Sequence, residues 1–68
     1  MMKARNFHEK VLITILDWLR DNDFPPVTKN ISNILELPVA KVASEIDKLA
    51  EEGLILFNRT NNRITLPD

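Results

Sequence analysis

The hydrophobic period of this chain changes at Gly53, the only glycine among its 68 residues. Before Gly53, apolar residues recur every three or four positions, as on one face of an α-helix. After it, short apolar segments flank a polar stretch, as in a pair of strands. Glycine is suited to the left-handed position that closes a helix. The chain is therefore predicted to place its helices first and to end in a β-hairpin.

Length and composition indicate a single folded domain. Apolar residues make up 44% and charged residues 28% of the sequence, a balance typical of globular proteins. A chain of this size can build one hydrophobic core, so we expect one domain over residues 1–68, with residues 1–6 flexible. There is no cysteine, no membrane-length apolar run and no signal-peptide pattern. These features predict a cytoplasmic protein without disulfides or a membrane segment.

The first helix is predicted over residues 7–22, where apolar residues gather on one broad face. Asn6 is a favourable N-cap, and Glu9 is placed to complete a capping box. Two consecutive prolines, Pro25 and Pro26, prevent the helix from continuing. The segment that ends at Val27 is therefore expected to be extended and could form a short strand.

Two further helices are predicted before Gly53. The second covers residues 29–36 behind an N-cap at Thr28. The third covers residues 38–52, with Pro38 at the first helical position, where its missing N–H is not needed. The residues expected on their buried faces are Ile31, Ile34 and Leu35 in the second helix, and Val39, Val42, Ile46, Leu49 and Ala50 in the third.

The hairpin is predicted from strands over residues 54–57 and 64–66. Asn61 and Asn62 are the candidates for a two-residue turn, because asparagine tolerates positive φ better than other residues with a side chain. In that register Phe57 lies opposite Leu66. The residues expected on the buried face of the hairpin are Ile55, Phe57, Ile64 and Leu66.

This order of elements resembles the winged helix-turn-helix fold, which is mainly α with three helices and a C-terminal β-hairpin wing. Residues 27–55, which close with Glu-Gly-Leu-Ile, are similar to the core of bacterial regulators such as the MarR and ArsR groups. A domain this short also resembles the small fimbrial regulators. The chain departs from the pattern where Glu36 or Leu37 replaces the usual glycine of the turn and where Ser32 replaces alanine. A residue other than glycine at positive φ costs about 1 kcal/mol.

The resemblance implies a transcriptional regulator that binds double-stranded DNA. The third helix would enter the major groove, and the wing would contact the backbone or the minor groove. The wing favours this function because residues 58–63 hold two arginines and no acid. The residues predicted to contact DNA are Thr28 and Lys29 at the start of the second helix, Ala40, Lys41, Ser44 and Lys48 on the third, and Arg59, Asn61, Asn62 and Arg63 in the wing.

The charge distribution leaves a second interpretation open. The net charge is −1, and residues 36–52 hold five acids against two lysines. The outer face of the third helix could be an ordinary solvated surface with weak ion pairs along the helix, and the wing a polar turn. The alternative function is a winged-helix protein-protein interaction module that uses the acidic third helix, with Ile13 exposed on the first helix. A homodimer or a larger protein partner would raise a weak affinity for DNA through linked sites.

Enzymatic function finds no support in the sequence. His8 is the only histidine, and it is expected at the edge of the core or as a cap in the first turn of its helix. Asp17 and Asp21 share a helix face, but no histidine or further carboxylate accompanies them, so they are interpreted as solvated surface. One glycine cannot form a glycine-rich phosphate loop. The sequence therefore predicts no catalytic residue, no cofactor and no metal.

Overall fold

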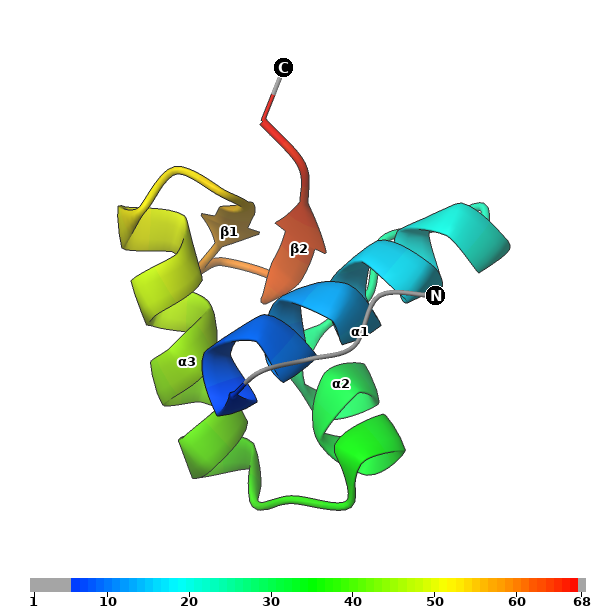
Figure 1. Ribbon diagram of the computed structural model, residues 1–68. Coiled ribbons are helices and arrows are strands. Elements are labelled where there is room, and N and C mark those ends of the chain that lie inside the picture. The colour runs from blue at the N-terminus through cyan, green and yellow to red at the C-terminus, as the bar shows by residue number, and fades with distance from the viewer. Residues whose placement is uncertain (1–5, 68) are drawn as a thin grey trace.

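The computed structural model describes residues 6–67, in which three helices are followed by an antiparallel hairpin (Figure 1). The elements are α1 (Phe7–Asp21), α2 (Thr28–Leu35), α3 (Val39–Glu51), β1 (Leu56–Asn58) and β2 (Arg63–Thr65). The predicted mainly α fold with a C-terminal hairpin is confirmed, and this order is compatible with a winged-helix topology. The flexibility expected for the N-terminus concerns residues 1–5, which lie outside the described residues. No described helix is long and apolar enough to cross a membrane.

The core lies where α1 crosses α2 and α3 and meets the hairpin (Figure 1). All three helices and the hairpin region contribute fully buried side chains, each of which stabilises the fold by about 1.5–3 kcal/mol. The buried apolar residues are Val11, Ile15, Ile31, Val42, Ile46, Leu49, Ile55 and Ile64. The prediction for the third helix is confirmed at Val42, Ile46 and Leu49.

Two residues assigned to the core from their helical spacing lie on the surface instead. Ile34 is 52% exposed and Val39 is 47% exposed. They flank the tight connection between α2 and α3, which projects away from α1 and the hairpin (Figure 1). Helical periodicity identifies a face but not how far the neighbouring elements extend along it. Ile13 was expected to be exposed on the first helix, but it is half-buried.

The predicted N-cap of α1 by Asn6 is confirmed, and the segment after the helix is fixed by an aromatic contact. The Asn6 side chain accepts a hydrogen bond from the Glu9 amide at 2.9 Å. After the helix, Trp18 Nε1 donates to the Phe24 carbonyl at 2.9 Å, and the two rings meet edge to face. The extended segment then forms a single bridge between Val27 and the hairpin. The short strand expected there is thus reduced to one bridge.

The start of α2 corrects the predicted cap. Thr28 is the first residue inside the helix and is 6% exposed, so its side chain does not cap the helix. Val27 occupies the capping position, and its amide donates to Asn30 Oδ1 at 2.9 Å. Because Asn30 reaches back from within the first turn, the chain fixes the start of α2 without a polar side chain at the cap itself.

The two positions that depart from the helix-turn-helix pattern, Ser32 and the residue in place of glycine, both shape the connection between α2 and α3. Glu36 takes the left-handed conformation, with φ 55°. Its amide bonds to the Asn33 carbonyl at 3.3 Å, and the Leu37 amide bonds to the Ser32 carbonyl at 3.1 Å. The Ser32 hydroxyl, which has no counterpart in alanine, donates to the Leu37 carbonyl at 2.5 Å. Ser32 therefore closes a turn that has no glycine.

The ends of α3 differ from the prediction by one residue at each side. Pro38 is the N-cap rather than the first helical residue, and the helix ends before residue 52. Gly53 is left-handed, with φ 77°, as predicted. Its amide bonds to the Ala50 carbonyl at 3.0 Å, and the Leu54 amide bonds to the Leu49 carbonyl at 3.1 Å. This pair of bonds is the Schellman pattern in which glycine is favoured.

The hairpin register differs from the prediction by two residues. Phe57 lies opposite Ile64 rather than Leu66, so four residues, 59–62, connect the strands. A shift of two keeps each side chain on its face of the sheet, and Ile55 and Ile64 are buried as expected. Leu66 lies beyond the last pair and is 43% exposed.

Two asparagine side chains explain the longer connection. Asn58 Oδ1 accepts from the Thr60 amide at 2.9 Å, and Asn61 Oδ1 accepts from the Arg63 amide at 3.0 Å. Such bonds replace backbone turns. Asn62 carries the positive φ, 60°, that the sequence predicts in this region.

Candidate nucleic-acid interface

The outward face of α3 carries the side chains that the sequence assigns to DNA. Ala40, Lys41, Ser44 and Lys48 are all exposed, because Val42, Ile46 and Leu49 turn the opposite face to the core. At α2, Lys29 is exposed but Thr28 is buried. The predicted side-chain contact of Thr28 with DNA is therefore incompatible with its position.

Both lysines of α3 already have weak partners. Lys41 Nζ lies 5.1 Å from the centre of the Phe7 ring, which draws it toward the beginning of α1. Lys48 Nζ lies 3.8 Å from Glu45 Oε2, one helical turn away. An exposed cation–π contact is worth about 0.5–1 kcal/mol, and the Lys48 side chain is 63% exposed although Glu45 is buried. Either lysine can exchange such a partner for a phosphate.

The wing is connected to α3 by an ion pair. Arg59 Nη2 lies 3.1 Å from Asp47 Oδ1, and the same guanidinium lies 5.7 Å from the centre of the Phe57 ring. Asp47 Oδ1 is shielded from solvent and has no hydrogen-bond partner among the described residues, so the charge of Arg59 is its compensation. The Arg59 side chain itself is 72% exposed. The wing is thereby held beside the outward face of α3.

The remaining wing residues surround its tip. Asn61, Asn62 and Arg63 are exposed. Arg63 Nη1 reaches the Pro25 carbonyl at 3.4 Å, on the side of the hairpin away from β1. The structure thus brings Arg59 to α3 and directs Arg63 toward the extended segment before α2. The two wing arginines do not form one continuous cationic patch.

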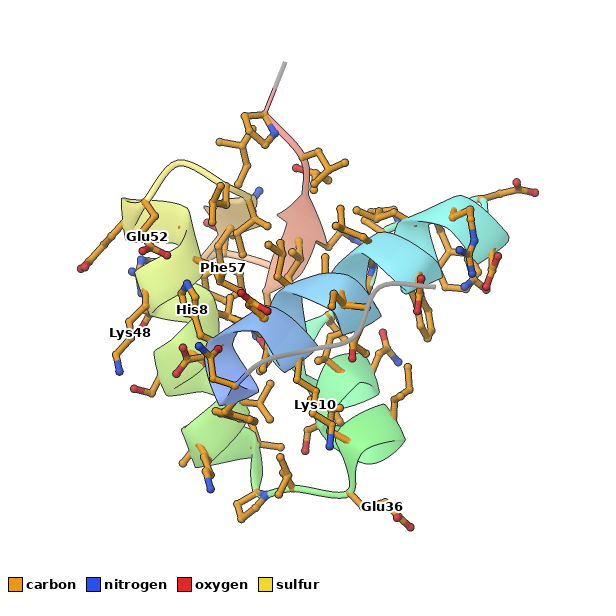
Figure 2. All side chains as sticks on the ribbon, viewed as in Figure 1. His8, Lys10, Glu36, Lys48, Glu52 and Phe57 are labelled. Atoms are coloured by element: carbon orange, nitrogen blue, oxygen red, sulfur yellow. The ribbon has the colours of Figure 1, made fainter. Side chains whose placement is uncertain are left out.

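A charged cluster between α1 and α3 was missed by the sequence analysis. His8 Nδ1 lies 2.5 Å from Glu45 Oε1, and His8 Nε2 lies 2.6 Å from Glu52 Oε1. Figure 2 shows His8 extending from α1 toward α3, near Glu52. Glu45 is buried, with 8% of its surface exposed. The seven-residue spacing of the two glutamates places them on one face of α3, but nothing in the sequence pairs that face with His8.

The environment of His8 favours its charged form. The hydrogen bond to Glu45 raises the pKa of the His8 imidazole above its ordinary value of 6.5, partial burial opposes this, and the charge and hydrogen bond of Glu52 raise it further. Both ring nitrogens face carboxylates, which is the arrangement that a doubly protonated ring satisfies.

An open hollow of about 460 Å³ adjoins this cluster. Three of its six lining residues are glutamates, and the full set is Asn6, His8, Glu45, Lys48, Glu51 and Glu52. Across residues 6–67 no three histidine, aspartate or glutamate side chains are arranged to hold a metal ion.

No protein-family model matches the chain, and neither the curated proteins nor the solved structures contain a significant match.

Proposed function

We propose that this chain is a winged helix-turn-helix module of a transcriptional regulator that binds double-stranded DNA. In this proposal α3 enters the major groove and the wing, residues 58–63, contacts the backbone or the minor groove. The observation that carries the proposal is the pairing of the acids of α3 with cations from other elements, because these acids were the main argument against DNA binding.

The pairing removes much of the repulsion that α3 would exert on phosphate. Arg59 of the wing compensates Asp47, and His8 of α1 contacts both Glu45 and Glu52. Of the acids that the sequence places in residues 36–52, Glu36 lies in the α2–α3 connection and extends away from the body of the domain (Figure 2). The outward face that holds Lys41 is thus less acidic than the composition of α3 indicates.

The side chains on that face are compatible with contacts to base edges in the major groove of DNA. Ala40 and Ser44 are small and exposed, so the helix backbone can approach bases closely. The alanine methyl can contact a thymine methyl, and the serine hydroxyl can bond to any base or to phosphate. Lys41 and Lys48 are longer and can reach guanine or phosphate.

The wing and α2 supply the contacts to the backbone in this proposal. The Arg59 side chain is 72% exposed while Nη2 contacts Asp47, so its remaining N–H groups can donate to phosphate without releasing Asp47. Asn61, Asn62 and Arg63 add donors at the tip. At the start of α2, Lys29 remains a candidate for a phosphate contact, whereas the buried side chain of Thr28 is withdrawn.

A second candidate function is protein binding, as a homodimer or with a larger partner. The acidic side chains around the hollow beside α3 favour a basic partner, because Glu51 and Glu52 are both exposed there. Under this alternative, Lys41 and Ser44 have no ligand. Their replacement would then leave the affinity for the partner unchanged.

Competition between a fluorescently labelled duplex, selected for tight binding from a randomised pool, and unlabelled mixed-sequence duplex DNA distinguishes the two functions. Lys41→Glu combined with Ser44→Ala removes two donors from the outward face and repels phosphate, so we expect the ratio of specific to non-specific affinity to fall to near one at a fixed salt concentration. Lys10→Glu is the matched control, because it makes the same change of charge on α1, where Lys10 is exposed. Equal losses of affinity in the Lys41→Glu/Ser44→Ala variant and in Lys10→Glu would mean that α3 has no special role.

A further inference from the structure

We propose that His8 is a pH-sensitive latch that fastens the beginning of α1 to the C-terminal half of α3, closed when the imidazole is protonated and loosened when it is neutral. This inference concerns the fold itself and does not depend on DNA binding. It is carried by the position of one ring between a carboxylate of α3 and that of its C-cap residue, at 2.5 Å from Glu45 and 2.6 Å from Glu52.

The two states of the ring differ in how many carboxylates they can hold. A protonated imidazole donates from both nitrogens, so it bonds Glu45 and Glu52 at once. A neutral imidazole donates from one nitrogen and presents a lone pair from the other. One of the two carboxylates then faces a lone pair and loses its compensating charge. Because Glu45 is buried, water cannot fully replace the positive charge that its carboxylate loses when the ring becomes neutral.

Within residues 6–67, no second cation contacts both carboxylates. The described charged groups around the ring from α3 are Glu45, Lys48, Glu51 and Glu52. On α1, Glu9 and Lys10 follow His8 in the sequence. Lys48 reaches only the second oxygen of Glu45, at 3.8 Å. The positive end of the helix dipole lies at the beginning of α1 and opposes protonation of His8.

The direction of the pH effect follows from these contacts. The pKa of His8 is raised in the folded protein, first by the hydrogen bond to Glu45. The stabilisation by the latch is therefore complete below about pH 6.5, the ordinary value for histidine, and disappears as the pH rises through the higher folded-state pKa. Acidification from neutral pH tightens the contact between α1 and α3.

Because His8 is the only histidine, its imidazole proton resonance can be followed through a pH titration of the whole chain. We expect a midpoint above 6.5 in the wild type. Glu45→Gln and Glu52→Gln should each lower the midpoint, with the larger decrease in Glu45→Gln. Glu51→Gln is the control, because it removes the same charge from the same hollow and leaves both ring contacts in place.

Urea unfolding at several pH values provides the second readout. Between about pH 6 and pH 8.5 the wild-type unfolding constant should rise, by about tenfold for each unit that the pKa is raised, whereas that of His8→Gln should stay level. If Glu45→Gln fails to fold, Glu52→Gln still tests the latch, because Glu52 is exposed. A wild-type midpoint at or below 6.5, equal effects of Glu51→Gln and Glu52→Gln, or a pH dependence that persists in His8→Gln would each overturn the latch.

Discussion

The two faces of α3 are held by different kinds of contact. The inward face, with Val42, Ile46 and Leu49, is buried as its helical spacing predicts. The outward and lateral faces present the expected side chains, but Glu45 and Asp47 also have ionic partners on α1 and in the wing. A periodic pattern is a local property, whereas an ion pair between elements depends on how those elements pack. Apolar faces can therefore be predicted from one sequence more readily than the charge of a surface.

The largest expected effect comes from the inward face. Ile46→Ala should destabilise the domain by about 2–5 kcal/mol, because it removes buried methyl groups and leaves a cavity in a small core. Ile46 is fully buried. Chemical denaturation monitored by the fluorescence of the single tryptophan measures this loss. A free energy of unfolding close to that of the wild type would show that the inward face has been assigned wrongly.

The two left-handed positions that flank α3 should respond with opposite signs. Glu36→Gly should stabilise the domain by about 1 kcal/mol, since it relieves a strained backbone, and Gly53→Ala should destabilise it by a similar amount. A Cβ at residue 53 would have no atom within 4 Å, so strain alone decides its effect. Thermal melting of both variants tests this. A stabilised Gly53→Ala would contradict the account of these helix ends.

A smaller effect on stability, together with a clear effect on binding, is expected from the wing. Arg59→Ala combined with Arg63→Ala should change the free energy of unfolding by less than about 1 kcal/mol, because both side chains are exposed. If both contact phosphate, the slope of log affinity for duplex DNA against log salt should flatten by about one to two units. An unchanged slope would remove the wing from the proposed interface.

The sequence predicted the order of the elements, the cap of α1 by Asn6 and the left-handed Gly53, since each depends on neighbours along the chain. It misplaced Val39 because periodicity does not tell where the packed neighbours end. It also missed the burial of Glu45, because a charged residue within a helix gives no sign that a histidine of another helix will meet it. Most candidate contacts of the site were correctly expected to be exposed, whereas Thr28 was not, because Asn30 performs the capping assigned to it.

The hairpin register also depended on contacts that the sequence pattern does not predict, here between residues close together in the chain. The hairpin's position and polar tip followed from composition, but the register depended on whether the Asn58 and Asn61 side chains would bond to the backbone of the loop. These bonds favour four connecting residues over two. The choice between turns of similar energy rests on such local bonds.

The most direct test of the central claim is an amide chemical-shift titration of the whole chain with mixed-sequence duplex DNA at low salt. The account predicts shifts on the outward face of α3, at Ala40, Lys41 and Ser44, and in the wing at residues 59–63, with little change at the middle of α1. Absence of duplex-induced shifts on both α3 and the wing under these conditions would contradict DNA binding and favour the acidic surface as a docking site for a basic protein.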